Sequence, residues 1–179
     1  PSAGSTITKE EHLEVPVVDG CLEGSPADDI LKAFVFERHH NTGSFAYGFA
    51  KGFGIHGALA QTVAHDAHNL LVIGDNDEDM ALAASLLVDC GGGEVAVEDG
   101  KVLGQVKLPI LGLMSPKSVE EVAAEVRGAE AAWAKMGCTM PSPFMTMALL
   151  SLACIPDLRL TNRGYVDGHT YQFVPVVVE

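Results

Sequence analysis

Basic residues are scarce in this sequence. Its 179 residues include 11 Lys and Arg against 24 Asp and Glu, so the formal net charge is −13. Nucleic-acid phosphates and anionic membrane surfaces both bind basic footprints, and we therefore expect neither nucleic acid nor a membrane as a partner.

Long apolar runs and closely spaced cysteines are also missing. The longest stretch without Asp, Glu, Lys or Arg, residues 136–156, is interrupted by prolines and polar residues, which argues against a membrane span. No signal peptide is visible, and the chain starts at Pro1 rather than Met, which suggests a fragment of a longer polypeptide. The cysteines form no C-x-x-C unit, so we expect reduced thiols in a cytoplasmic protein. They are Cys21, Cys90, Cys138 and Cys154.

Apolar residues are abundant despite the acidic charge. They make up 47% of the chain, whereas charged residues make up only 20%, which excludes a disordered protein and allows a hydrophobic core. The length suits one domain, and no internal repeat or second domain is visible. We expect an extended lead-in with a short strand over residues 1–29, followed by one domain over residues 30–179.

Short apolar segments and longer periodic ones share this domain, which predicts the α+β class, with a mixed β-sheet and about three helices packed on it. We expect strands, in chain order, at residues 30–37, 44–49, 70–73, 94–98, 101–108 and 171–178, and a further apolar segment at 58–64. Residues 70–73 form a continuous apolar run, which is typical of a strand buried on both faces. Asp99-Gly100 predicts a tight hairpin turn.

Three helices are predicted from capping signals and apolar spacing. Asn76 can cap the first helix, whose first turn is acidic, and Gly91 can end it. Ser118 and Glu121 form a capping-box pair at the start of the second helix. Apolar residues recur at every third or fourth position of that helix. They are Val119, Val122, Val126, Ala129, Trp133 and Met136. A third, apolar helix is expected over residues 144–153.

Histidines are concentrated in one part of the chain. Five of the seven fall within residues 39–68, and the most informative group is residues 65–69 (HDAHN). A bend there could direct two imidazoles and a carboxylate to one point, whereas a straight strand would point His65 and His68 to opposite sides. Three interpretations stay open: a polar turn that caps backbone groups, a turn that lines a site, or a metal site that uses both imidazoles. The pair His39-His40 is interpreted as a turn.

A glycine motif offers a second candidate site. Gly52–Gly57 (GFGIHG) matches the G-x-G-x-x-G pattern, and Asp75 lies where an acid could hold a ribose. That fingerprint should begin a helix, however, and the apolar segment that follows is too short for one. We interpret the glycines as a loop that needs positive φ or close backbone approach, with a nucleotide-binding loop as the alternative.

Six segments of the chain form an ordered set that is familiar as a whole. They are residues 64–74 (AHDAHNLLVIG), 76–80, 91–93, 108–115 (LPILGLMS), 143–152 and 155–168. Together they resemble the C-terminal domain of bacterial and archaeal adenine deaminases of the amidohydrolase superfamily. The resemblance extends from about Ile7 to the C-terminus. One departure is Ala67, where the family commonly has Ser.

The resemblance implies an activity, the hydrolysis of adenine to hypoxanthine and ammonia by a metal-bound hydroxide. In that family the metals sit in a (β/α)₈ barrel whose first ligands are a His-x-His pair. This chain has no His-x-His, and it is too short for a barrel of about 250 residues. We therefore expect the barrel, with its divalent Mn, Fe or Zn, to be absent from this chain, and the isolated chain to be inactive.

The resemblance also implies that the domain packs against the barrel and covers the active site or supports a homo-oligomer, in an enzyme whose substrate is adenine. The residues expected to face the active site are His65, Asp66, His68 and Asn69. Two alternatives stay open: a purely structural domain that forms oligomers through residues 119–136 or 144–153, and an independent domain that binds a metal or a nucleotide through residues 65–69 or Gly52–Gly57. Part of the apolar surplus should form an interface with the barrel or a sister subunit.

Overall fold

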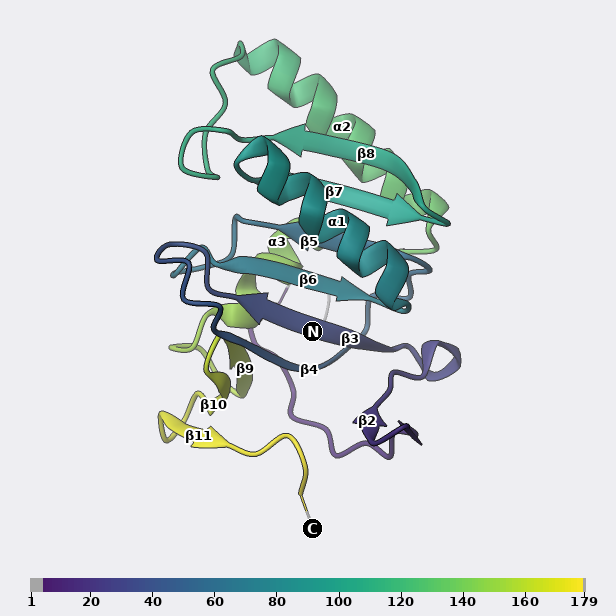
Figure 1. Ribbon diagram of the computed structural model, residues 1–179, viewed down its shortest axis with the longest axis vertical. Coiled ribbons are helices and arrows are strands. Elements are labelled where there is room, and N and C mark those ends of the chain that lie inside the picture. The colour runs from purple at the N-terminus through teal and green to yellow at the C-terminus, as the bar shows by residue number, and fades with distance from the viewer. Residues whose placement is uncertain (1–4, 179) are drawn as a thin grey trace.

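The computed structural model describes residues 5–178 and centres on a six-stranded sheet with the strand order β4-β3-β6-β5-β7-β8 (Figure 1). Its strands are β3 (Ile30–Phe36), β4 (Phe45–Lys51), β5 (Ala58–Gln61), β6 (Leu70–Gly74), β7 (Gly93–Glu98) and β8 (Lys101–Lys107). The predicted α+β class is confirmed, and the sheet that was expected to be mixed pairs antiparallel at each of its interfaces.

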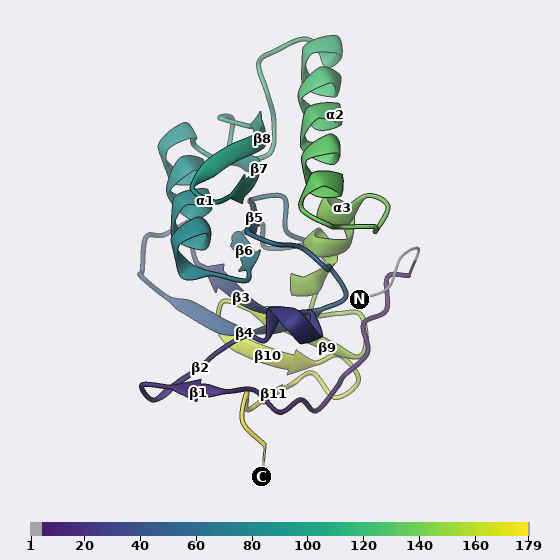
Figure 2. The same cartoon turned by 90° about the vertical axis from the view of Figure 1, so that its right-hand side faces the viewer.

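The helices cover the sheet from both sides (Figure 2). The helix α1 (Asp77–Cys90) packs over β5, β6 and β7 on one face. The helices α2 (Val119–Lys135) and α3 (Pro143–Ala148) contribute to the apolar cluster on the other face. No helix within residues 5–178 is both long enough and apolar enough to cross a bilayer.

Local capping signals set the helix boundaries as predicted. The Asn76 side chain accepts a hydrogen bond of 2.8 Å from the Asp79 N–H at the start of α1, and Gly91 ends that helix in the left-handed region at φ 86°. Ser118 and Glu121 form the reciprocal capping box of α2. The hairpin turn between β7 and β8 is Asp99-Gly100, and both residues have positive φ.

A smaller sheet lies beyond β4 (Figure 1). It contains β9 (Leu158–Thr161), β10 (Gly164–Asp167) and β11 (Gln172–Val174). Separately, β1 (Val17–Val18) and β2 (Cys21–Leu22) form a hairpin within the lead-in. Tyr165 joins the two sheets, because its hydroxyl donates to the Phe49 carbonyl at 2.9 Å and accepts from the Phe49 N–H at 2.6 Å. A Cβ at Gly48 would lie 2.3 Å from the Tyr165 oxygen, so the contact requires glycine there.

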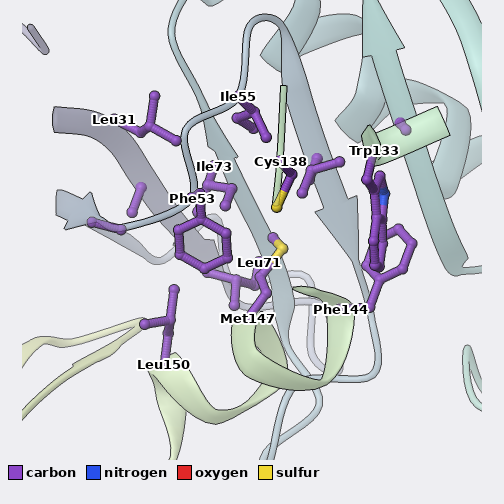
Figure 3. Packing of buried hydrophobic residues seen from close by; sticks show 14 of the residues in the cluster. Leu31, Phe53, Ile55, Leu71, Ile73, Trp133, Cys138, Phe144, Met147 and Leu150 are labelled. Carbon is purple, nitrogen blue, oxygen red and sulfur yellow. The ribbon is translucent and has the colours of Figure 1, made fainter. Parts of the chain in front are cut away.

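Two apolar clusters, one on each face of the large sheet, form the core. The strand β6 runs between them, with Leu71 and Ile73 in the cluster beneath α2 and α3, and its alternate residues in the cluster beneath α1. Because both faces are covered, residues 70–73 are apolar without alternation. In the larger cluster Trp133 of α2 and Phe144 of α3 meet edge to face, with ring centroids 3.9 Å apart (Figure 3).

Several predicted boundaries were wrong. Val119, expected on the buried face of α2, is 75% exposed, because this face first packs against the core at Val122. The third helix stops at Ala148 and continues only as the 3₁₀ turn η2 (Leu149–Ser151). The final strand is limited to β11, since Pro175 has no N–H to extend the ladder. The expected ranges at residues 1–4 and at residue 179 lie outside the described residues.

Candidate functional site

The sequence-predicted histidine group lies at one end of the large sheet, where β3 and β8 end and β6 begins (Figure 1). We call residues 65–69 the histidine turn. Arg38, just after β3, donates from Nε to the His68 carbonyl at 2.5 Å and from Nη2 to the Leu111 carbonyl at 2.7 Å. Asn69 donates to the Asn162 side chain at 3.2 Å. Loops that are far apart in the sequence therefore contact one another at this end of the large sheet.

The histidine turn directs its two imidazoles to the same region. The rings of His65 and His68 have centroids 5.3 Å apart and meet at 63°. This arrangement depends on a bend, because His68 is in the left-handed region at φ 51° and its N–H donates to the Ala64 carbonyl at 2.7 Å. The turn is anchored on the end of α3 and on η2, where the Ala148 carbonyl accepts from the His65 N–H and the Ser151 hydroxyl donates to the His65 carbonyl.

The four predicted site residues differ in their access to solvent. Asp66 is exposed, His65 and His68 are half-buried, and Asn69 is only 5% exposed. Two atoms at this position, His68 Nδ1 and Asn69 Oδ1, are buried without a hydrogen-bond partner in the described part of the chain. Such groups are rare in folded proteins and are concentrated where water, an ion or a ligand completes the structure.

The imidazole of His68 is held neutral at neutral pH. Burial lowers its pKa, and the nearby His65 and Arg38 lower it further, against a smaller opposing effect of Asp66. A neutral imidazole has one donor and one acceptor nitrogen, so His68 can bind a polar ligand in either role.

Two further residues of the site, Arg38 and His39, were missed from the sequence. His39 Nε2 lies 2.6 Å from the Ala67 carbonyl, so the ring contacts the histidine turn directly. His39-His40 do form a turn, as predicted, and the Glu37 carboxylate holds it. Burial alone would raise the pKa of Glu37, but hydrogen bonds from His40, Thr42 and His39 outweigh burial and lower this pKa to about 2. The sequence alone does not show that β3 pairs with β6, and this pairing brings Arg38 and His39 to the histidine turn.

Other segments of the ordered set pack at the same end of the sheet. The Thr62 hydroxyl donates to the Gly112 carbonyl at 2.7 Å and accepts from the Gly93 N–H at 2.8 Å. A Cβ at Gly92 would lie 2.5 Å from the Gly112 Cα, so the triple-glycine segment allows the loop after β8 to approach closely. These glycines therefore help to position the loop that Arg38 also holds.

The glycine loop lies at the opposite end of β5 and does not have the context of a dinucleotide fingerprint. Gly52–Gly57 connects β4 to β5, so no helix begins there. Its N–H groups are also occupied: Gly52 and Gly54 donate to the Asp29 carboxylate at 2.8 and 2.7 Å, and Gly57 donates to Asp75 at 2.8 Å. These contacts argue against the nucleotide-binding alternative for this loop, because two carboxylates accept from N–H groups that a pyrophosphate would need.

The histidine turn does not fit a metal by itself. Within residues 5–178 no group of three or more His, Cys, Asp or Glu side chains is placed to hold a metal ion, and His65 and His68 supply only two imidazoles. Protein sites for Zn²⁺ use at least three protein ligands. The arrangement instead offers hydrogen-bond donors and acceptors beside one guanidinium group.

A hollow of about 800 Å³ is lined by other residues. It lies between the lead-in, β4, the small sheet and residues 174–178, and its lining includes many aliphatic side chains. None of the residues of the histidine turn lines it. This hollow is therefore separate from the candidate site, which we select by the convergence of polar side chains.

Comparison with known proteins adds a further observation. Residues 5–172 match the family model described as the adenine deaminase C-terminal domain. An adenine deaminase of Clostridium botulinum is 62% identical over 173 residues, which is 96% of this chain and 29% of the relative. An adenine deaminase of Moorella thermoacetica is 53% identical over 95% of the chain and 29% of its own length. One from Dehalococcoides mccartyi is 39% identical over 96% of the chain and 30% of its own length. The chain thus spans less than a third of these relatives.

Proposed function

Because the chain belongs to the adenine deaminase C-terminal domain family, we propose that it is the C-terminal part of an enzyme that hydrolyses adenine to hypoxanthine and ammonia. The match with less than a third of each relative supports this proposal. The barrel with its divalent metal, Mn, Fe or Zn, belongs in our proposal to that larger part. Since residues 5–178 offer no three-ligand group, we assign no metal ligand and derive no step through a metal here.

We further propose that the histidine turn faces the substrate. The observation that carries this proposal is the convergence of Arg38, His39, His65 and His68 at one end of the sheet. An adenine ring presents acceptor nitrogens and an amino group, and the neutral imidazole and the guanidinium can bind such groups. Burial of the unpartnered His68 Nδ1 and Asn69 Oδ1 supports a site that a further component completes.

The experiment is to replace the histidines one at a time in the full-length polypeptide and to measure adenine deamination. We expect His65→Ala and His68→Ala each to lower kcat/KM by roughly tenfold or more, the effect of one lost hydrogen bond at a site. His56→Ala is the matched control, because His56 is exposed at the opposite end of β5. Unchanged kinetics in both variants would remove the histidine turn from the active site.

Support of an oligomer is a second candidate role, and one surface favours it. Four aromatic side chains of β3 and β4 pack together on the same sheet face as α1, over strands that α1 does not cover: Phe34, Phe36, Phe45 and Tyr47. The Phe45 and Tyr47 rings are exposed. The apolar face of α2 cannot serve this role, because Ala129, Trp133 and Met136 are buried in the core. Phe45→Asp should therefore lower the molar mass in light scattering if the aromatic surface joins two copies.

A further inference from the structure

The loop after β8 carries a group of exposed apolar side chains. We call residues 109–114 the Leu111 loop. Ile110, Leu111 and Met114 all point into solvent, and Leu111 is 73% exposed. No charged residue occurs from Leu108 to Pro116, although the chain has a net charge of −13. A stretch this apolar and this free of charge is suited to contact another apolar surface.

The exposure of Leu111 is built into the fold. Ile110 and Met114 close the loop with two backbone hydrogen bonds of 3.1 Å, and Arg38 donates to the Leu111 carbonyl at 2.7 Å. Leu111 itself is in the left-handed region at φ 59°, a conformation that residues with a side chain adopt only where the surroundings enforce it. The loop therefore presents its leucine in one fixed position.

The Leu111 loop borders the histidine turn directly. One guanidinium, that of Arg38, bonds both the His68 carbonyl and the Leu111 carbonyl. The apolar side chains of the loop thus lie beside the polar side chains that we propose to face the substrate. A polar site next to an apolar contact surface is expected where a second structural unit closes the site and excludes water.

We propose that the Leu111 loop docks on the catalytic portion of the same polypeptide and thereby closes the histidine turn against the active site. This inference rests on the proposed function. The 173 matched residues are 29% of the Clostridium botulinum relative, which leaves 100 − 29 = 71% of that protein outside the match. The proposed function assigns the catalytic portion to that remainder, so every copy of the full-length polypeptide carries it tethered to this domain.

The test is photo-crosslinking in the full-length polypeptide. A photoreactive benzoylphenylalanine replaces Leu111 in one variant and Val119 in the control, because Val119 is equally exposed, at 75%, but lies at the start of α2. We expect the photoreactive residue at position 111 to crosslink to the catalytic portion of its own chain. The variant with the photoreactive residue at position 119 should not form this product. A crosslink from position 111 to a second copy, or a yield no higher than that of position 119, would overturn the docking surface.

Activity separates this inference from the proposed function. Adenine deamination is therefore measured on the unsubstituted full-length polypeptide. Activity there without a crosslink from position 111 refutes the docking surface alone, whereas a crosslink from position 111 in a polypeptide whose unsubstituted form does not deaminate adenine refutes the proposed function alone. If docking closes the site, Leu111→Asp lowers kcat/KM for adenine by roughly tenfold, the factor that the loss of one buried leucine produces. Equal kinetics of Leu111→Asp and Val119→Asp would refute closure of the site.

Discussion

Replacement of Glu94 by glutamine should stabilise the protein at alkaline pH. Glu94 is on β7, opposite Gln61 of β5 and on the sheet face that α2 covers. Burial raises the pKa of its carboxyl, and the Glu130 carboxylate of α2 raises it further, to about 7. The folded structure therefore favours the protonated, neutral form of the Glu94 carboxyl.

The sign and size of the effect follow from this pKa. Below the ordinary value of 4.5 both the folded and the unfolded chain are protonated, so Glu94 imposes no penalty. Between pH 4.5 and 7 the unfolded chain ionises first, and the free energy of unfolding falls by up to about 1.4 kcal/mol per pH unit. From the difference of 7 − 4.5 pH units, the full penalty above pH 7 reaches about 3 kcal/mol. Glutamine has a similar shape and cannot ionise, so the variant escapes the penalty.

The assay is urea-induced unfolding of the 179-residue chain at pH 5 and at pH 8.5, followed by circular dichroism. We expect the advantage of Glu94→Gln over the unchanged chain to grow by about 2.5 kcal/mol between the two pH values, because a small part of the penalty is already present at pH 5. The comparison across pH cancels any constant cost of the substitution. Glu14→Gln, at an exposed position of the lead-in, is the control and should show no such growth. An advantage of Glu94→Gln that is independent of pH would refute the reasoning.

Two further predictions concern buried charged groups that satisfy backbone atoms. Asp79→Ala should lower the free energy of unfolding by about 3 kcal/mol in the same urea assay, because the buried carboxylate accepts from the N–H groups of Asp99 and Gly100; full stability would contradict this role. Arg159→Met should cost about 3 kcal/mol or more, since this side chain is 1% exposed and donates to four backbone carbonyls. Arg159→Lys should recover only part of the loss, because an ammonium lacks the planar fork; equal stability of both variants would contradict that explanation.

Features encoded over a few residues were predicted well. The cap at Asn76, the capping box at Ser118 and the hairpin turn at Asp99-Gly100 each depend on neighbours within four positions, and each is present as expected. The strand β6 was equally clear, because a strand covered on both faces leaves a continuous apolar run. Local physics therefore accounts for most element boundaries of the large sheet.

Features that depend on distant pairing were not predictable in the same way. Arg38 and His39 join the site only because β3 pairs with β6, which brings Phe36 opposite Leu70 at the start of the histidine turn. The strands β9 and β10 were missed because each is four residues long and stable only against its neighbours. The exposure of Val119 likewise depends on where α2 first meets the sheet.

The acidic and yet apolar composition now has a partial structural explanation. Much of the apolar content forms two clusters because the sheet is covered on both faces. The exposed remainder includes the Leu111 loop and the aromatic surface of β3 and β4. These are the surfaces that we assign to the catalytic portion and to a second copy, respectively.

The most direct test of the proposed site is kcat/KM for adenine in the full-length polypeptide that carries His65→Ala and His68→Ala together. If the histidine turn faces the substrate, the double variant loses roughly tenfold or more in kcat/KM, while its melting temperature stays close to that of the His56→Ala control. A double variant that deaminates adenine as efficiently as this control would show that the histidine turn lies outside the active site.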